Sequence, residues 1–258
     1  MQRTLIFVYG VLVYILFLGV FAYAFGFVAN AFVPKGIDDG TASGFWPALF
    51  INSALLALFA VQHAVMARPA FKKWITQYIP KPAERTTFVF ATCLVFIALF
   101  IFWQPMTGVI WHVEHAAIRA VIWGLFITGM LTVLYSSFLI DHFDLFGLRQ
   151  VVLHAKKVEY WQRPFMERSL YKLVRHPLMV GFLIAFWAAP TMTVGHLLFS
   201  IMTTAYIFVG IQMEERDLIR QHGEQYLAYK RRTGGLLPRF ARRPAAPPQS
   251  TGHGPAVN

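Results

Sequence analysis

The sequence has a single cysteine and few charged residues. Cys93 lies within an apolar run, so one chain can form neither a disulfide framework nor a thiolate metal cluster. Only 14% of the 258 residues are charged, whereas 57% are hydrophobic. A soluble domain of this length needs less apolar sequence to build its core, so the composition favours an integral membrane protein. The sequence has no internal repeat, and no His, Cys and carboxylate set has metal-ligand spacing, so we expect no metal.

Acidic residues are scarce as well, with 12 Asp and Glu against 23 Lys and Arg, which gives a net charge of +11. In a soluble protein this excess of basic charge would indicate a nucleic-acid partner. Here the basic residues gather between apolar runs, which is typical of a membrane protein whose loops face an anionic leaflet. We therefore expect membrane lipids, and no nucleic acid, among its partners; the sequence leaves the oligomeric state open.

Long apolar runs make up much of the chain. A membrane-spanning helix needs about 20 apolar residues at a rise of about 1.5 Å each. Four runs have about this length: Thr4–Ala29, Pro47–Met66, Thr87–Gln104 and Ala120–Ile140. The first run is longer than the apolar part of a signal peptide, so we predict that it is retained as a transmembrane helix.

A fifth apolar region, Leu178–Met213, is interrupted by Pro190. Because proline lacks a backbone donor and disfavours helix in the preceding residue, we predict a helical hairpin. Its short arm, Leu178–Ala189, would extend about 18 Å, too little to cross the bilayer alone, and its longer arm is Thr193–Met213. The expected fold class is all-α. It is a polytopic membrane bundle of four spanning helices, this C-terminal hairpin and a cytoplasmic amphipathic C-terminal helix.

The Lys and Arg residues outside the runs predict the topology. Alternate segments, 1–3, 67–85, 141–177 and 214–258, hold 21 of the 23. The positive-inside rule places these segments and both termini in the cytoplasm. We expect one integral-membrane domain over residues 1–240, and a disordered Pro-rich tail over residues 241–258.

The first polar motif on this predicted cytoplasmic side is Arg175-His176-Pro177, with Gly181 one helical turn later. Pro177 suits the first turn of a helix, whose free N–H groups and positive dipole end can hold an anion. Gly181 permits close approach to the backbone. On spacing alone, however, a basic membrane anchor with a helix-starting proline is the favoured interpretation.

Two further motifs follow the hairpin. Glu214-Glu215 comes directly after its long arm, and because a hairpin returns its ends to one side, these carboxylates could face Arg175 and His176. A solvated helix end explains the acidic pair equally well. Tyr226 and Tyr229 lie in the amphipathic C-terminal helix, where an interfacial position would account for them without a ligand.

The spaced combination of these motifs resembles the C-terminal signature of the isoprenylcysteine carboxyl methyltransferase and phospholipid methyltransferase superfamily. Segments 62–69, 82–85 and 141–150 are similar to its nurim-like branch, and within that branch to bacterial members that convert methanethiol to dimethyl sulfide. The resemblance covers about Leu5–Pro238. NnrU-type relatives share much of this pattern, so a different small or lipid-soluble acceptor stays open.

The resemblance implies methyl transfer from S-adenosylmethionine to a small thiol, at the cytoplasmic face of a bacterial inner membrane. It implies that the cofactor is held by the C-terminal half, about residues 141–240. The positions that match cofactor-binding residues of the superfamily are Arg175, His176, Pro177, Gly181, Glu214, Glu215, Tyr226 and Tyr229.

A small alkanethiol has a higher pKa than the value of about 8.5 typical of cysteine, so a base would assist its methylation. The candidate catalytic residues are His142, His63 and Asp144. His142 stands between carboxylates at the end of a span, although a histidine bonded to a neighbour would look the same. His63 lies inside a span, where ionisable groups tend to be functional or paired; Asn52 and Gln62 are alternative structural partners.

Two other classes of protein fit parts of the sequence. A transporter would carry polar residues at mid-membrane on several helices and two matching halves, which are not seen. A non-catalytic membrane protein would not require the acidic pair beside the Arg-His-Pro motif.

Overall fold

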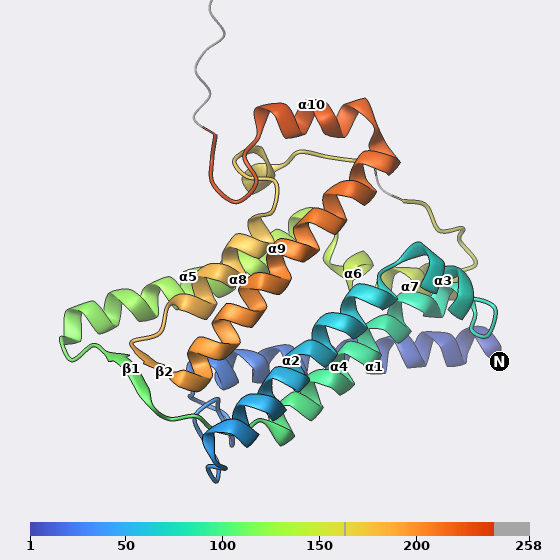
Figure 1. The fold of residues 1–258 in the computed structure, drawn as a ribbon. Coiled ribbons are helices and arrows are strands. Elements are labelled where there is room, and N and C mark those ends of the chain that lie inside the picture. Colours follow the sequence, from blue (N-terminus) through green and yellow to red (C-terminus); the bar gives the residue numbers. More distant parts are fainter. Residues whose placement is uncertain (163, 240–258) are drawn as a thin grey trace, which may run out of the picture.

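The computed structural model describes residues 1–162 and 164–239, so the predicted tail over residues 241–258 lies outside the described residues. Within these described residues, five helices are long and apolar enough to cross a membrane: α1 (Gln2–Ala29), α2 (Phe45–Met66), α4 (Glu84–Phe102), α5 (Ala116–Ile140) and α9 (Val194–His222). At most 33% of the most apolar stretch of each is buried within the protein, as expected of helices that face lipid. The predicted all-α, multi-pass membrane fold is confirmed (Figure 1).

Shorter elements connect these helices. They are α3 (Pro69–Ile75), α6 (His142–Leu145), α7 (Leu148–Ala155), α8 (Pro177–Trp187), α10 (Glu224–Arg232) and the 3₁₀ turns Lys81–Ala83 and Ser169–Lys172. α8 is the predicted short arm, and its 11 residues extend only about 16 Å. The long arm, α9, continues past the expected end at Met213 to His222, so that Glu214 and Glu215 lie on the helix itself.

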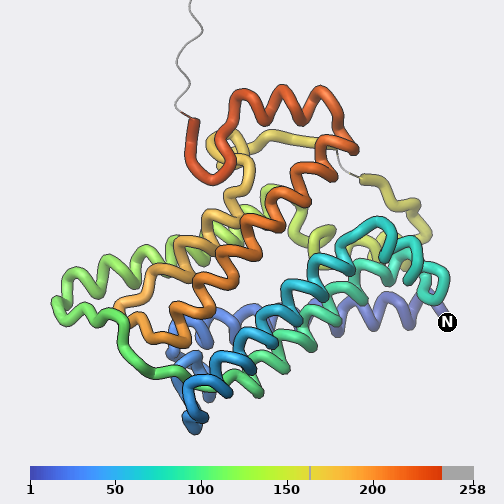
Figure 2. The backbone as a smooth tube through the Cα atoms, viewed as in Figure 1, coloured from blue at the N-terminus to red at the C-terminus, as the bar shows by residue number. Residues whose placement is uncertain are grey.

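The long helices pack in a row. α1 contacts α4, α4 contacts α2, α2 contacts α9, α9 contacts α8, and α8 contacts α5 (Figure 2). α9 contacts both α2 and α8 and so links the N-terminal helices to the α5–α8 pair. α10 follows α9, beyond the C-terminal end of that helix (Figure 1).

A small antiparallel sheet was not predicted. β1 (Val109–His112) pairs with β2 (Thr191–Thr193) in the register Val109↔Thr193 and His112↔Thr191. It ties the α4–α5 connection to the turn between α8 and α9. Strands this short gain their hydrogen bonds only from a partner distant in sequence, so local pattern does not reveal them.

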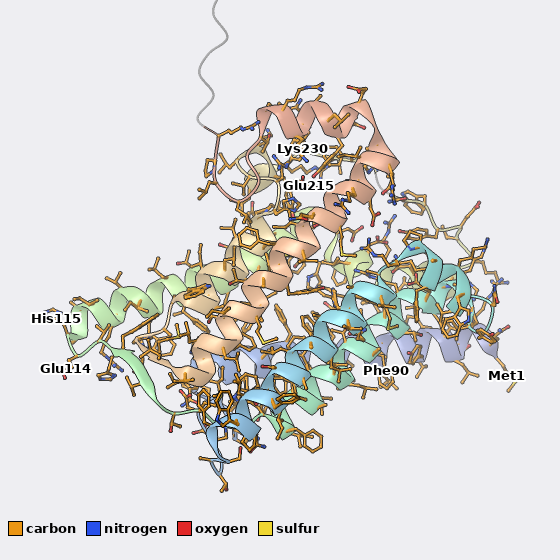
Figure 3. The ribbon with its side chains drawn as sticks, in the orientation of Figure 1. Met1, Phe90, Glu114, His115, Glu215 and Lys230 are labelled. Atoms are coloured by element: carbon orange, nitrogen blue, oxygen red, sulfur yellow. The ribbon has the colours of Figure 1, made fainter. Side chains whose placement is uncertain are left out.

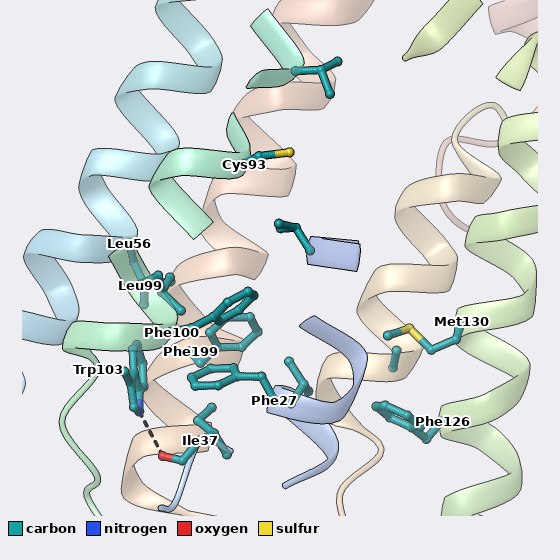
Figure 4. Packing of buried hydrophobic residues seen from close by; sticks show 14 of the residues in the cluster. Phe27, Ile37, Leu56, Cys93, Leu99, Phe100, Trp103, Phe126, Met130 and Phe199 are labelled. Carbon is teal, nitrogen blue, oxygen red and sulfur yellow. Dashed lines mark hydrogen bonds between the residues drawn. The ribbon is translucent and has the colours of Figure 1, made fainter. Parts of the chain in front are cut away.

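The largest buried cluster lies where α1, α4 and α9 meet. Phe27 and Phe199 pack against Trp103, and Phe100 packs against Phe27. The indole nitrogen of Trp103 donates a 2.9 Å hydrogen bond to the carbonyl of Ile37 (Figure 4). Cys93 is buried in the same cluster, where it packs as a small apolar side chain.

Two glycines bring α5 and α8 into backbone contact. A Cβ added at Gly181 would lie 2.6 Å from the carbonyl oxygen of Gly129, and one added at Gly129 would lie 2.7 Å from that of Gly181. Only residues without a side chain permit this approach. Gly181, one of the predicted cofactor-binding residues, therefore has a packing function at this crossing.

Replacement of Gly181 with Ala should separate α5 from α8, because the added methyl group meets rigid backbone atoms. Overpacking of this kind destabilises a protein by about 1–3 kcal/mol. The melting temperature of the detergent-purified protein measures the effect. Gly124→Ala, also in α5, is the matched control, since a Cβ there meets no heavy atom within 4 Å. Equal melting temperatures for the two variants would contradict the packing role.

Candidate active site

The start of α8 and the last turns of α9 meet, as the hairpin predicts. The carboxylate of Glu215 is the centre of this meeting point. It accepts from Arg175 through Nε at 2.8 Å and Nη2 at 2.7 Å, and from Lys230 Nζ at 2.7 Å. His176 Nε2 lies 3.1 Å from the same carboxylate. We call Arg175, His176, Glu214, Glu215 and Lys230 the charged cluster; Figure 3 shows Glu215 and Lys230 facing each other from α9 and α10.

The segment after α10 closes over the charged cluster. The backbone N–H of Arg175 donates to the carbonyl of Gly234 at 2.8 Å, and that of His176 donates to Gly235 at 3.2 Å. Arg175 Nη1 also donates to the carbonyl of Thr233. The Arg-His-Pro motif is thus held from both sides, by a carboxylate of α9 and by carbonyls of the C-terminal segment.

The two adjacent glutamates have different environments. The Glu215 side chain is 10% exposed and has three basic partners, whereas that of Glu214 is 48% exposed and lies 3.4 Å from His176 Nδ1. Residues next to each other on a helix point about 100° apart, which explains the difference. Glu215 therefore organises the cluster, and Glu214 retains lone pairs for a ligand.

His176 is buried between the two glutamates. Burial by itself would lower its pKa, but hydrogen bonds and charge interactions with Glu214 and Glu215 outweigh burial and raise the pKa above the ordinary value of 6.5. The cluster thus favours the imidazolium form.

Three aromatic rings back the charged cluster. Tyr226 and Tyr229 of α10 are almost fully buried, and Phe165 packs against both at 5.8 and 5.3 Å between ring centroids. The Tyr229 hydroxyl donates to the carbonyl of Tyr171. The buried Tyr226 hydroxyl has no hydrogen-bond partner among the residues that the structure describes. Its pKa is raised, by burial first and then by the charge of Glu215.

Pro177 occupies the first turn of α8, as predicted, with His176 as the N-cap residue. Lys230 was not assigned to the site from sequence, although it follows Tyr229 directly. The sequence signal was its place in a basic run, which by itself predicts only a membrane-facing helix.

The candidate base His142 lies in a separate cluster beside α1. Its Nδ1 is 2.8 Å from Ser137 Oγ, and its Nε2 is 2.9 Å from the Tyr14 hydroxyl. Because the Ser137 hydroxyl donates to the carbonyl of Leu134, it accepts from Nδ1–H, and Tyr14 donates to Nε2. Both ring nitrogens are thus used, which is the bonded arrangement considered as the alternative to a base.

Asp144 is also engaged by neighbours. Its carboxylate contacts Arg149 at 3.3 Å and accepts from the Tyr160 hydroxyl at 3.1 Å. Arg149 additionally contacts Asp141 and stacks over the ring of Trp161. This network ties the segment after α7 to the α6 turn.

His63 differs from His142 and Asp144 in its hydrogen bonding. Its ring packs among Phe59, Phe88 and Tyr206, at 5.3, 4.8 and 6.2 Å between centroids. Its Nδ1 is buried with no hydrogen-bond partner in the described part of the chain. Neither alternative partner takes that position: Asn52 pairs with the backbone of Gln104, and the Gln62 amide donates to Met66.

The family model of the NnrU protein matches residues 52–234, most of the chain. The chain belongs to the NnrU family. The match covers α2 to α10 and so includes the charged cluster and His63.

Several relatives of this chain are named methanethiol S-methyltransferase. A methanethiol S-methyltransferase of Mycobacterium tuberculosis is 47% identical over 92% of this chain and 98% of its own length. Methanethiol S-methyltransferase 1 of Bradyrhizobium diazoefficiens is 48% identical over 92% and 83%. Nurim of Rattus norvegicus is 29% identical over 64% and 65%. No solved structure matches. The predicted likeness to these relatives is confirmed.

The raised pKa of His176 predicts a pH-dependent stability. The protonated ring is stabilised only in the folded protein, so its contribution is complete below about pH 6.5 and is lost as the pH rises through the raised value. Thermal melts of the purified protein across this range should show that loss, and His176→Gln should flatten it. An unchanged slope in His176→Gln would contradict the assignment.

Proposed function

We propose that the protein transfers a methyl group from S-adenosylmethionine to a small thiol, with methanethiol as the first acceptor and dimethyl sulfide as the product. The observation that carries this proposal is the charged cluster. It brings Arg175, His176 and Glu214 together in a chain whose relatives at 45–48% identity are named methanethiol S-methyltransferase.

The residues at the cluster fit such a cofactor. Glu214 presents a half-exposed carboxylate, which can accept from ribose hydroxyls and attract a cationic sulfonium. Beside it, the buried Tyr226 hydroxyl has no hydrogen-bond partner among residues 1–162 and 164–239, and aromatic faces attract cations. Glu215, Arg175 and Lys230 hold one another and position these groups.

The chemistry requires alignment and removal of a proton. When bound, S-adenosylmethionine supplies a methyl group on a sulfonium centre, and it leaves as a neutral thioether. The thiol sulfur forms the new bond to carbon, and its proton must be accepted by a base. We assign that proton to Nδ1 of His63, because both nitrogens of His142 are bonded and Asp144 is paired with Arg149.

We further propose that the cluster faces the cytoplasm of a bacterial inner membrane, with both termini inside. The segments that hold 21 of the 23 Lys and Arg support this orientation. Residues 1–240 would form one catalytic domain, with residues 141–240 as its cofactor half.

Purified protein given labelled S-adenosylmethionine and methanethiol should release labelled dimethyl sulfide into the headspace. Glu214→Gln should weaken cofactor binding roughly 10-fold to 100-fold, as for loss of a charged hydrogen-bond acceptor, and Arg175→Ala should abolish it. Glu224→Gln, an exposed carboxylate of α10, is the matched control and should bind normally. Normal cofactor binding by both site variants would refute the pocket. A panel of thiols, selenols and amines then defines the acceptor.

Replacement of His63 with Asn should remove the base while keeping a polar side chain. At neutral pH kcat should fall at least 100-fold, the lower range for loss of a general base. The rate should recover as the pH approaches the pKa of the thiol, because free thiolate then forms in solution. Cofactor affinity should not change. A variant with the kcat and pH profile of the unaltered protein would show that His63 is not the base.

A further inference from the structure

One face of α9 lies against α2 at two levels. Near the middle of the helix, Tyr206 contacts the rings of Phe59 and His63. About three helical turns later, Asp217 pairs with Arg68 at 3.0 Å, just beyond the end of α2. The two helices therefore run side by side in the same direction, with one contact between Tyr206 and His63 and a second between Asp217 and Arg68.

Gly210 lies on the same face of α9, between these two contacts. It is one turn after Tyr206 and about two turns before Asp217, so all three residues point in similar directions. A Cβ added at Gly210 would find no heavy atom within 4 Å outside its own helical turn and chain neighbours. The seam between α2 and α9 thus contains an open space at this level.

The space at Gly210 differs from that at other open glycines of the spanning helices. Gly19 and Gly124 also have no neighbour within 4 Å, but both are exposed on the outer surface of the bundle. Gly210 is half-buried, whereas Phe208, on the opposite face of α9, is exposed. The space at Gly210 therefore lies beside a half-buried residue on the face of α9 that contacts α2, whereas Gly19 and Gly124 are exposed.

The position of this space suits a reacting thiol. Gly210 stands one turn, about 6 Å along the axis, from Tyr206 at the His63 level and one turn from Glu214 in the charged cluster. Toward His63, the next groups are the rings of Phe88 and Tyr206 and Nδ1 of His63, which has no hydrogen-bond partner among the described residues. Methylated sulfur makes favourable contacts with aromatic rings.

We propose that the space beside Gly210 is the site of the acceptor, a small apolar thiol, between His63 and the charged cluster. The inference rests on the proposed methyl transfer. It makes Gly210 the residue that limits acceptor size, because every side chain at this position would project into the space.

The test compares Gly210→Val with Gly124→Val in the full-length protein. In Gly210→Val, kcat/KM for methanethiol should fall at least tenfold, while the dissociation constant for S-adenosylmethionine and the melting temperature stay unchanged. Gly124→Val should keep the kcat/KM of the unaltered protein. Gly210→Ala should retain methanethiol turnover and lose activity progressively from ethanethiol to propanethiol.

Other results would overturn the inference. Unchanged acceptor kinetics in Gly210→Val, or an equal loss in Gly124→Val, would show that the space does not hold the thiol. A parallel loss of cofactor affinity in Gly210→Val would place the cofactor there instead. If the unaltered protein binds S-adenosylmethionine but methylates no thiol, the proposed function itself fails, and this inference fails with it.

Discussion

The charged cluster depends on one carboxylate. Glu215 is buried and receives hydrogen bonds from Arg175 and His176 at the start of α8 and from Lys230 of α10. A buried charge is tolerated only when it is paired and hydrogen-bonded, so these contacts are mutually dependent. Through them Glu215 fixes the start of α8, the end of α9 and α10 relative to one another.

The adjacent residues Glu214 and Glu215 therefore have different roles: Glu215 is structural, and Glu214 is a candidate for ligand binding. The Glu215 carboxylate accepts hydrogen bonds from groups of the protein. The Glu214 side chain points about 100° away around the helix and presents its carboxylate outward beside His176. The same separation is seen among the histidines. Both nitrogens of His142 are bonded, whereas Nδ1 of His63 has no partner within the described residues. Unused hydrogen-bonding capacity in a buried place is the feature that distinguishes the candidate chemical groups.

α9 connects these groups in space. Tyr206, Gly210 and Glu214 follow one another at single-turn intervals on this helix, and Tyr206 contacts His63 across the seam with α2. A small apolar acceptor could therefore meet the cofactor without leaving the bundle, which keeps water away from the reacting sulfur.

The sequence by itself determined the membrane class, the spanning helices and the hairpin. Apolar run length and a proline that interrupts helix are local properties, and bilayer thickness converts them directly into spans. It also singled out most members of the charged cluster, through the family resemblance and because a hairpin allows Glu215 to return to the side of Arg175. Only the tertiary structure decided which candidate side chains are hydrogen-bonded to neighbours and which keep an unused hydrogen-bonding atom. The bonding of His142 to Tyr14, the backbone contact at Gly181, the entry of Lys230 and the β1–β2 pairing all join residues distant in sequence. Such contacts depend on how helices rotate and cross, and hydropathy carries no information about either.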